Sequence, residues 1–303
     1  MANQKDIKTR INSVKNTQKI TRAMKMVASA KVKKAEYSVK SARPFAEELL
    51  TMFKRMLATV GTVSDEGETY PMAINNYPAL LTRREIKTEG VLVVTSNKGL
   101  AGAYNANIVR DLLKRISDNK EKGIDTKVYV VGQKGISALQ NKPNINIIKT
   151  YIAVMDNPNS SGANIIAEDI AEDYVSGVID KIEIITTRFN NMMSYSIQNW
   201  EVLPLDIDYD EDEHKLDALM EFVPNAKAIL QKIVPMFITN EIFQALLEAY
   251  ASELASRMTA MSAASNNAEN MISELTVSLN KARQSAITNE LIEVVSGASA
   301  TSK

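Results

Sequence analysis

The 303-residue chain contains no cysteine and a single histidine, His214. The absence of cysteine excludes disulfides, thiolate metal sites, cysteine nucleophiles and dithiol redox switches. One histidine leaves little basis for an imidazole-ligated metal or a catalytic triad. Glycine (11) and proline (8) are also scarce, which favours long uninterrupted elements over many short strands and turns. We therefore expect no catalytic site, no metal and no cofactor.

Long apolar runs are missing as well. No stretch approaches the roughly 18 apolar residues that a membrane span requires, and no apolar segment follows the first residues as a secretory signal would. Hydrophobic residues (45%) and charged residues (24%) occur in the proportions of a globular protein. The composition predicts a soluble protein that is cytoplasmic or held at a membrane through another protein.

The formal net charge of zero conceals an uneven distribution of charge along the chain. Residues 1–55 carry 14 Lys and Arg against 4 Asp and Glu, whereas the remainder carries 22 against 32. A basic arm on an acidic body usually indicates a polyanionic partner. Nucleic acid, a lipid surface and an acidic protein face all remain open on charge alone.

The first 60 residues show a heptad pattern, in which mostly apolar residues recur in steps of four and three over seven repeats. The seam consists of Ile7, Ile11, Val14, Gln18, Thr21, Lys25, Ala28, Val32, Ala35, Val39, Ala42, Ala46, Leu49, Phe53, Met56 and Val60. This pattern predicts one long coiled-coil helix. Pro44 interrupts it, so a kink or a break is expected near Arg43.

The seam turns polar at Gln18, Thr21 and Lys25. A second apolar stripe runs beside these positions and includes Met24. We expect this part of the helix to face more than its coil partner.

A second seam crosses the last seventy residues. It comprises Leu247, Ala251, Leu254, Met258, Met261, Ser265, Ala268, Ile272, Leu275, Leu279, Ala282 and Ala286. No proline or glycine lies between Pro235 and Gly297, so one uninterrupted helix is expected there. Two terminal helices with matching seams predict an antiparallel coiled coil that is closed by a middle domain.

The middle of the chain predicts an α/β domain. Buried strands are expected at 91–96, 127–132, 145–154 and 181–188, helices at 105–120 and 165–177, and loops at 61–79 and 204–214. Alternation of strand and helix implies parallel pairing, whereas residues 195–203 alternate in polarity and predict an antiparallel edge strand.

The expected fold class is therefore α/β with a long antiparallel coiled coil and a Rossmann-like centre. The expected divisions are a coiled-coil helix at 1–60, the α/β domain with its flanking loops at 61–214, and a second coiled-coil helix at 215–303.

Three segments carry possible chemistry. The turn at 96–105, with Gly99 and Gly102, either cradles a phosphate or is a tight strand-to-helix turn, and two glycines favour the second reading. The acidic run 206–213 lacks the spacing of a calcium loop and favours a solvated loop, with His214 exposed beside it. The basic residues of 5–34 lack interleaved aromatics, which favours solvated charge or an acidic protein partner over nucleic acid.

Residues 287–300 (ITNELIEVVSGASA) resemble the carboxy-terminal signature of F-type ATP synthase gamma subunits, and residues 7–28, 251–261 and 280–284 are similar to other segments of that family. The resemblance covers the whole chain in the right order. One departure is the turn at 97–102, where the family usually has DRGLCG and this chain has NKGLAG. The cysteine-bearing insertion of chloroplast members is missing, so no thiol switch is expected.

The resemblance implies a non-catalytic rotor shaft whose coil enters a hexamer of alpha and beta subunits, while nucleotides bind the hexamer. The α/β domain would meet the epsilon subunit and the membrane c-ring, with the run 206–213 near that contact. One copy per complex is implied, peripheral to the cytoplasmic face of a bacterial plasma membrane through the c-ring.

By resemblance, two groups of residues contact the alpha/beta hexamer. Met24 and its neighbour Lys25 would lie near an acidic loop of beta. The upper contact would comprise Arg257, Arg283, Gln284, Thr288, Glu290 and Glu293. The alternatives are a basic coiled-coil protein that binds nucleic acid and an α/β nucleotide-dependent enzyme that uses the turn at 96–105.

Overall fold

The computed structural model describes residues 4–60, 72–204 and 226–301, and the acidic run 206–213 and His214 lie outside these residues. The chain forms two compact units. The first consists of residues 1–29 and 257–303, and the second of residues 30–256.

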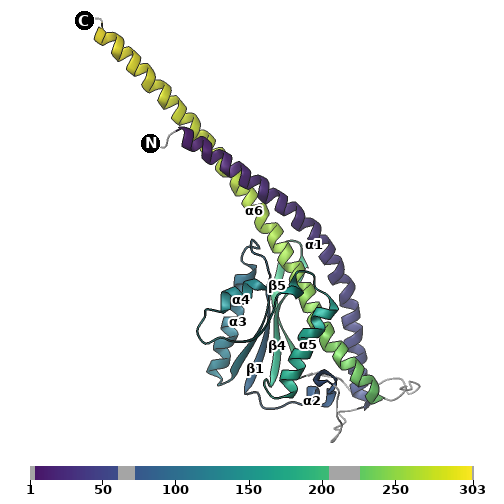
Figure 1. Cartoon of the computed structure of the whole chain (residues 1–303). Helices are drawn as coiled ribbons and strands as arrows, with labels where there is room; N and C mark the ends of the chain where they lie inside the picture. The colour runs from purple at the N-terminus through teal and green to yellow at the C-terminus, as the bar shows by residue number, and fades with distance from the viewer. Residues whose placement is uncertain (1–3, 61–71, 205–225, 302–303) are drawn as a thin grey trace. The chain divides into compact units, whose positions relative to one another are not determined.

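The first unit is a pair of helices. It contains the start of α1 (Gln4–Val60) and the end of α6 (Ala226–Thr301). Lys25 donates a hydrogen bond to Ser262, whereas Ile7 lines a groove with Ala282 and Ala286. Residues nearer the start of α1 therefore lie beside residues nearer the end of α6, and the pair is antiparallel as expected (Figure 1).

Both heptad seams are confirmed. Every predicted seam position of α6 is buried or half-buried, and so is every described seam position of α1 except Lys25. Lys25 is exposed, while its neighbour Met24 is half-buried in its place. The side chain of Val60 lies outside the described ones. A lysine at a seam position can reach the rim of the coil, because its long stem lets the ammonium group stay in water.

Of the kink or break expected near Arg43, the break is wrong, since α1 continues through Pro44. Pro44 is exposed, so the carbonyl that it leaves without a helical partner lies on the solvent side, where water can bind it.

Pro235 likewise lies inside α6, which begins at Ala226. The carbonyl of Gln231, which a proline four residues later cannot bond, accepts a hydrogen bond from Asn75 Nδ2 at 3.2 Å. A side chain from elsewhere in the fold thus replaces the missing donor, and the helix continues through the proline.

The second unit is built on a five-stranded sheet of order β3-β2-β1-β4-β5. Its strands are β1 (Thr88–Val94), β2 (Asp125–Val131), β3 (Asn146–Tyr151), β4 (Lys181–Asn191) and β5 (Ser194–Leu203). The first four are parallel and β5 pairs antiparallel with β4. The predicted strands and the antiparallel edge are confirmed, with ends that differ by a few residues.

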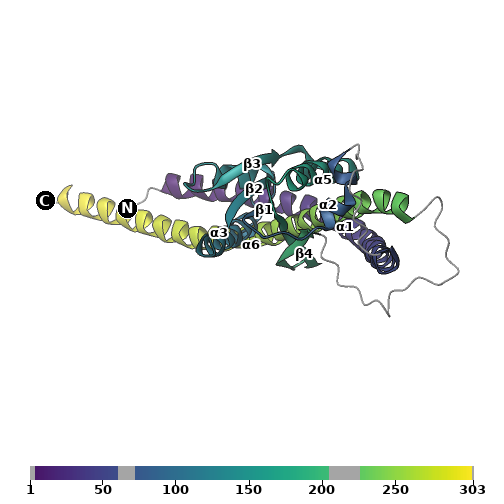
Figure 2. The same cartoon turned by 90° about the horizontal axis from the view of Figure 1, so that it is seen from below.

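Helices cover both faces of the sheet. On one face lie α3 (Tyr104–Glu121) and α4 (Gln133–Leu139). On the other lie α2 (Tyr77–Leu81), α5 (Ser160–Val175) and segments of α1 and α6 (Figures 1 and 2).

Short 3₁₀ helices occupy Ala73–Asn75 and Ala153–Met155. The loop expected at 61–79 is therefore wrong from residue 73 onward, while 61–71 lie outside the described residues. Helices as short as α2 and α4 complete too few turns to show a hydrophobic period.

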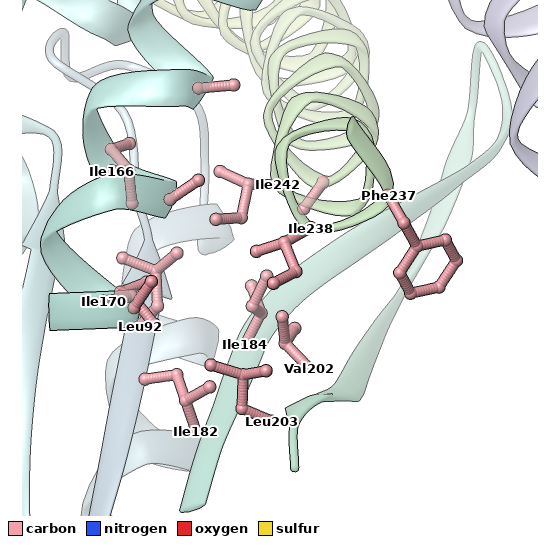
Figure 3. Close-up of a cluster of buried hydrophobic side chains, with 14 of the residues drawn as sticks. Leu92, Ile166, Ile170, Ile182, Ile184, Val202, Leu203, Phe237, Ile238 and Ile242 are labelled. Carbon is pink, nitrogen blue, oxygen red and sulfur yellow. The ribbon is translucent and has the colours of Figure 1, made fainter. Parts of the chain in front are cut away.

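The core of the second unit includes part of α6. Ile238 and Ile242 of this helix pack against Ile184 of the sheet, with Ile166 and Ile170 of α5 opposite (Figure 3). All five side chains are fully buried. Because burial of each such side chain stabilises a fold by about 1.5–3 kcal/mol, α6 is held as firmly as a core strand.

A buried charge cluster stabilises the opposite face. Glu89 of β1 and Glu183 of β4 are both nearly inaccessible, and Arg115 of α3 forms ion pairs with both. Asn119 adds a hydrogen bond to Glu89. One guanidinium thus pairs with two carboxylates, and Lys181 Nζ lies 3.9 Å from Glu89. Without these cations the buried carboxylates would repel each other with little water to screen them.

We expect Arg115→Met to lower the midpoint of thermal unfolding by roughly 6–20 °C, since removing one partner of a buried pair costs about 3–5 kcal/mol. Circular dichroism of the isolated chain measures the effect. Arg110→Met, at an exposed position of the same helix, is the matched control. Equal midpoints of thermal unfolding in the two variants would show that the cluster contributes no more to stability than a surface charge does.

Candidate functional site

The segment of α1 around Met24 presents two faces. Met24 itself is half-buried and Lys25 donates from Nζ to Ser262 Oγ at 2.9 Å. Ile20 and Val27, the neighbouring apolar stripe, are exposed by 61% and 57%. This part of α1 therefore contacts α6 with one face, while the apolar side chains of Ile20 and Val27 remain exposed beside Lys25.

The other predicted contact residues lie on α6, but the structure does not bring all of them together. Five of them fall within 283–293, and all five are exposed. Thr288 Oγ1 donates to the Gln284 carbonyl at 2.9 Å. Arg257 is half-buried and lies 26 residues before Arg283 on the same helix, a separation of about 39 Å at 1.5 Å per residue. Residues 283–293 and Arg257 thus form two separate surfaces.

Residues 287–295 form a tail, here called the apolar tail, in which our sequence reasoning singled out Thr288, Glu290 and Glu293 but not the apolar residues. They follow the last seam position, Ala286, and every one is exposed. The large apolar members are Ile287, Leu291, Ile292, Val294 and Val295. The signal in the sequence is a set of apolar residues that no longer follows the seam, as expected where a helix faces something other than its coil partner.

A polar joint fixes α6 to α1 and the sheet within the second unit. Glu248 of α6 is fully buried. Its carboxylate accepts two hydrogen bonds from Arg43 of α1, at 2.8 and 3.1 Å, and one from the backbone N–H of Phe189 in β4, at 2.7 Å. Arg43 also donates to the Phe189 carbonyl at 2.9 Å. One buried carboxylate therefore connects three elements.

Three further hydrogen bonds continue this joint along α6. Thr186 of β4 donates to the Ala245 carbonyl at 3.0 Å, and Tyr104 of α3 donates to the Ala249 carbonyl at 3.0 Å. Ser256 of α6 donates to the Ala101 carbonyl at 2.7 Å. Burial raises the pKa of Tyr104 well above its ordinary value, so its hydroxyl remains a donor.

Our sequence reasoning missed Glu248. The available signal was a carboxylate inside an otherwise apolar stretch of α6, because a buried charge of this kind needs a partner of opposite sign. The sequence does not show that the partner is Arg43, since the two residues are 205 positions apart.

The turn at 96–105 is filled by its own side chains. Asn105 Oδ1 accepts from the Ser96 N–H at 3.0 Å, and Ser96 Oγ donates to the Lys98 carbonyl at 2.8 Å. Gly102 has a φ of 57°, which favours glycine. A side chain at Gly99 would meet only Lys134, at an ordinary 3.5 Å, so close packing does not require glycine at this position. These contacts support a structural turn over a phosphate cradle.

Within the part of the chain that the structure describes, no group of three or more His, Cys, Asp and Glu could hold a metal ion. None of the described helices is long and apolar enough to cross a membrane.

Comparisons with known proteins agree with this arrangement. The family model described as ATP synthase matches residues 3–301. The ATP synthase gamma chain of Moorella thermoacetica is 38% identical over 300 residues, covering 99% of each chain. That of a Picosynechococcus species is 39% identical over 325 residues, covering 99% of this chain and 100% of the relative.

Solved structures show the same fold. A chain in the central stalk and c-ring structure of Tetrahymena thermophila mitochondrial ATP synthase is 26% identical, with a TM-score of 0.58 over 81% of this chain and 99% of that one. A chain in the Euglena gracilis mitochondrial ATP synthase structure with OSCP, F1 and c-ring is 18% identical, with a TM-score of 0.65 over 98% and 94%.

We expect Arg43→Met to lower the free energy of unfolding by about 3–5 kcal/mol, because it removes the bidentate partner of the buried Glu248 carboxylate and leaves only Arg188, whose Nε lies 3.9 Å away, as a cation beside it. Adding Glu248→Leu should restore part of the loss, since the orphaned charge is then removed. Urea denaturation of the isolated chain measures both.

The matched control is Lys40→Met, at a position about one turn before Arg43 on α1. It breaks a surface ion pair with Glu36 and should lower the free energy of unfolding by no more than about 1 kcal/mol. If Arg43→Met costs no more than this control, the joint does not hold the helices to the sheet.

Proposed function

The chain belongs to the family of ATP synthase gamma chains, and on that premise we propose that it is the central rotor shaft of an F-type ATP synthase. It is a stalk subunit and not a catalytic one. Its task is to transmit rotation between an ion-driven c-ring and a hexamer of alpha and beta subunits that synthesises or hydrolyses ATP.

The observation that carries this proposal is the joint at Glu248. A shaft must not turn inside the domain that drives it. Buried apolar packing and hydrogen bonds fix α6 to the sheet, and a bidentate ion pair fixes it to α1. Bonds to the backbone resist rotation of the helix about its own axis, because any rotation moves the carbonyls away from their fixed donors. Torque on the α/β domain thus passes into α6 without chemistry.

Surfaces of the two long helices supply the partner contacts. We assign the apolar tail at 287–295 and the polar residues Arg283, Gln284, Glu290 and Glu293 to the alpha/beta hexamer, together with Thr288. The second contact, near an acidic loop of beta, is assigned to Met24 and Lys25. Arg257 contributes to the hexamer contact at a lower level of the shaft. In this mechanism an asymmetric coil forces each beta subunit in turn through its conformational states.

The remaining assignments concern assembly. We propose one copy per complex, contact of the α/β domain with an epsilon subunit and the c-ring, and a peripheral position on the cytoplasmic face of a bacterial plasma membrane. The comparisons give no support to a nucleic-acid-binding protein, and the basic arm of α1 fits acidic faces of a protein partner instead.

Reconstitution tests the proposal. The purified chain is mixed with separately purified alpha and beta subunits, and ATP hydrolysis is compared with that of each component alone. We expect a stable complex with strongly raised and sustained hydrolysis, while the chain alone is inactive. Hydrolysis or DNA binding by the chain alone, with no complex formed, would exclude the shaft function.

Met24→Lys should uncouple rotation from ion transport. The variant places a second ammonium group beside Lys25, where an additional ion pair with the acidic loop of beta would have to break at every step. We expect ATP hydrolysis to continue while the number of ions transported per ATP falls, as measured in vesicles that contain the assembled complex.

Met26→Lys is the matched control, because Met26 is 64% exposed on a different face of the same turn. Normal transport per ATP in Met24→Lys, or an equal loss in the control, would contradict the assignment of Met24.

A further inference from the structure

A second arginine lies beside the buried carboxylate of Glu248. Arg188 of β4 approaches it with Nε at 3.9 Å from Oε1, whereas Arg43 of α1 donates two hydrogen bonds to it, at 2.8 and 3.1 Å. The Glu248 side chain is completely inaccessible, while the two arginine side chains are partly exposed. Two cations from two different elements therefore share one buried anion.

The carboxylate of Glu248 has room for a further donor. Its two oxygens offer about four acceptor positions, of which Arg43 occupies two and the Phe189 N–H, at 2.7 Å, a third. Arg188 Nε stands about 1 Å beyond hydrogen-bond length from Oε1. A displacement of that size lies within the reach of a partly exposed arginine side chain with several rotatable bonds, so Arg188 can reach the carboxylate without a large movement of β4.

Helix α1 is weakened at the same level. Pro44, which follows Arg43, lacks the N–H that would bond the carbonyl of Lys40. The ladder of α1 therefore misses one hydrogen bond in the turn that carries Arg43. Long helices bend most readily where such a bond is missing. The residue that holds Glu248 thus lies on a turn of α1 that yields easily under load.

The two helices at this joint are not held equally. Thr186 of β4 donates to the Ala245 carbonyl, and this hydrogen bond fixes α6 to the sheet. The buried apolar cluster between α1 and α6 includes Ala35, Ala251 and Ala255, whose methyl groups interlock less than larger side chains do. Apolar contact of this kind is not directional. When the joint is loaded, α1 is therefore the helix that shifts.

We propose that Arg188 is a positioning residue that serves as the reserve partner of Glu248. When load bends α1 at Pro44 and draws Arg43 away, the carboxylate pairs with Arg188 and is not left buried without a cation. Glu248 keeps its bond to the Phe189 N–H, so α6 stays fixed to the sheet while α1 shifts. This inference rests on the proposed function, because a load of this kind arises in a shaft that transmits torque.

Hydrogen exchange of one amide, measured by nuclear magnetic resonance on the full-length isolated chain, tests the inference. The Phe189 N–H bonds Glu248, so its exchange rate reports whether the carboxylate is in place. The N–H of Leu92, which is fully buried in β1, reports global unfolding. We expect the ratio of the Phe189 rate to the Leu92 rate to change less than about threefold in Arg43→Met and in Arg188→Met, and to rise at least about tenfold in the double variant that combines them.

Three further variants serve as controls. Arg43→Met combined with Arg110→Met, which removes a charge from an exposed position of α3, should behave as Arg43→Met alone. Glu248→Leu removes the acceptor of the Phe189 N–H and should raise the ratio, and adding Arg188→Met to it should then have no further effect. If the double variant does not fold, adding Glu248→Leu should restore folding, because the uncompensated buried charge is then removed.

Ion transport in vesicles that contain the assembled complex shows whether the exchange of partners serves the shaft. We expect Arg43→Met to transport as many ions per ATP as the unmodified chain, because Arg188 keeps α6 fixed to the sheet. The double variant should transport several-fold fewer, because neither cation then holds Glu248.

Four outcomes overturn the inference: a ratio in Arg43→Met as high as in the double variant, an unchanged ratio in the double variant, a further effect of Arg188→Met on Glu248→Leu, or no recovery of folding when Glu248→Leu is added. If the chain does not assemble with alpha and beta subunits, the proposed function fails, while the exchange rates still decide whether Arg188 is the reserve partner. If it assembles and Arg43→Met alone lowers transport per ATP, the reserve role fails and the proposed function stands.

Discussion

The structure depends on the burial of one stretch of α6, residues 230–255, against the sheet, α5 and α1. Apolar contact alone would hold this helix firmly, but contact between smooth, alanine-rich surfaces is not directional and allows a helix to slide or turn. The polar groups supply direction. Glu248 receives hydrogen bonds from Arg43 and from the backbone of Phe189, and only one rotation of α6 satisfies all of them. The energetic gain from such a buried pair is modest, whereas misplacing it is expensive.

The same logic accounts for the choice of partners along the joint. Thr186 and Tyr104 donate to backbone carbonyls of α6 that already lie inside a helix, so these bonds add a constraint without replacing the helical ladder. Ser256 reverses the direction and donates to the Ala101 carbonyl, which fixes the turn after β1 to the helix. The turn that resembled a phosphate site is thus part of the mechanical connection. Its side chains and carbonyls are occupied by the fold itself.

The repeating parts of this fold can be predicted from the sequence. Prediction fails where one contact between residues far apart in the chain determines the local structure. The seams of both long helices follow from heptad spacing, because each position faces the same partner along the whole coil. The strands follow from apolar runs that a buried parallel sheet requires. The break considered near Pro44 does not occur. Pro235 shows how a helix can accommodate a proline, since Asn75, 160 residues earlier, supplies the missing donor and no local rule contains that contact. Glu248 was missed for the same reason. The resemblance predicted six contact residues on α6, and the rise of the helix separates Arg257 from the other five.

The exposed segments of the two long helices can be explained by comparison with the buried segments. Along α1 the seam is apolar from Val32 to Met56, where it packs in the second unit, and polar near Gln18 and Thr21. Polar seam residues weaken a coil, so the first part of α1 gains less from its pairing than the later part does. A self-sufficient coil would have no reason to keep polar seam residues beside an exposed apolar stripe at Ile20 and Val27. A shaft that changes partners as it turns does have a reason to keep such residues, because a surface that binds one neighbour too strongly would hold the shaft in a single state.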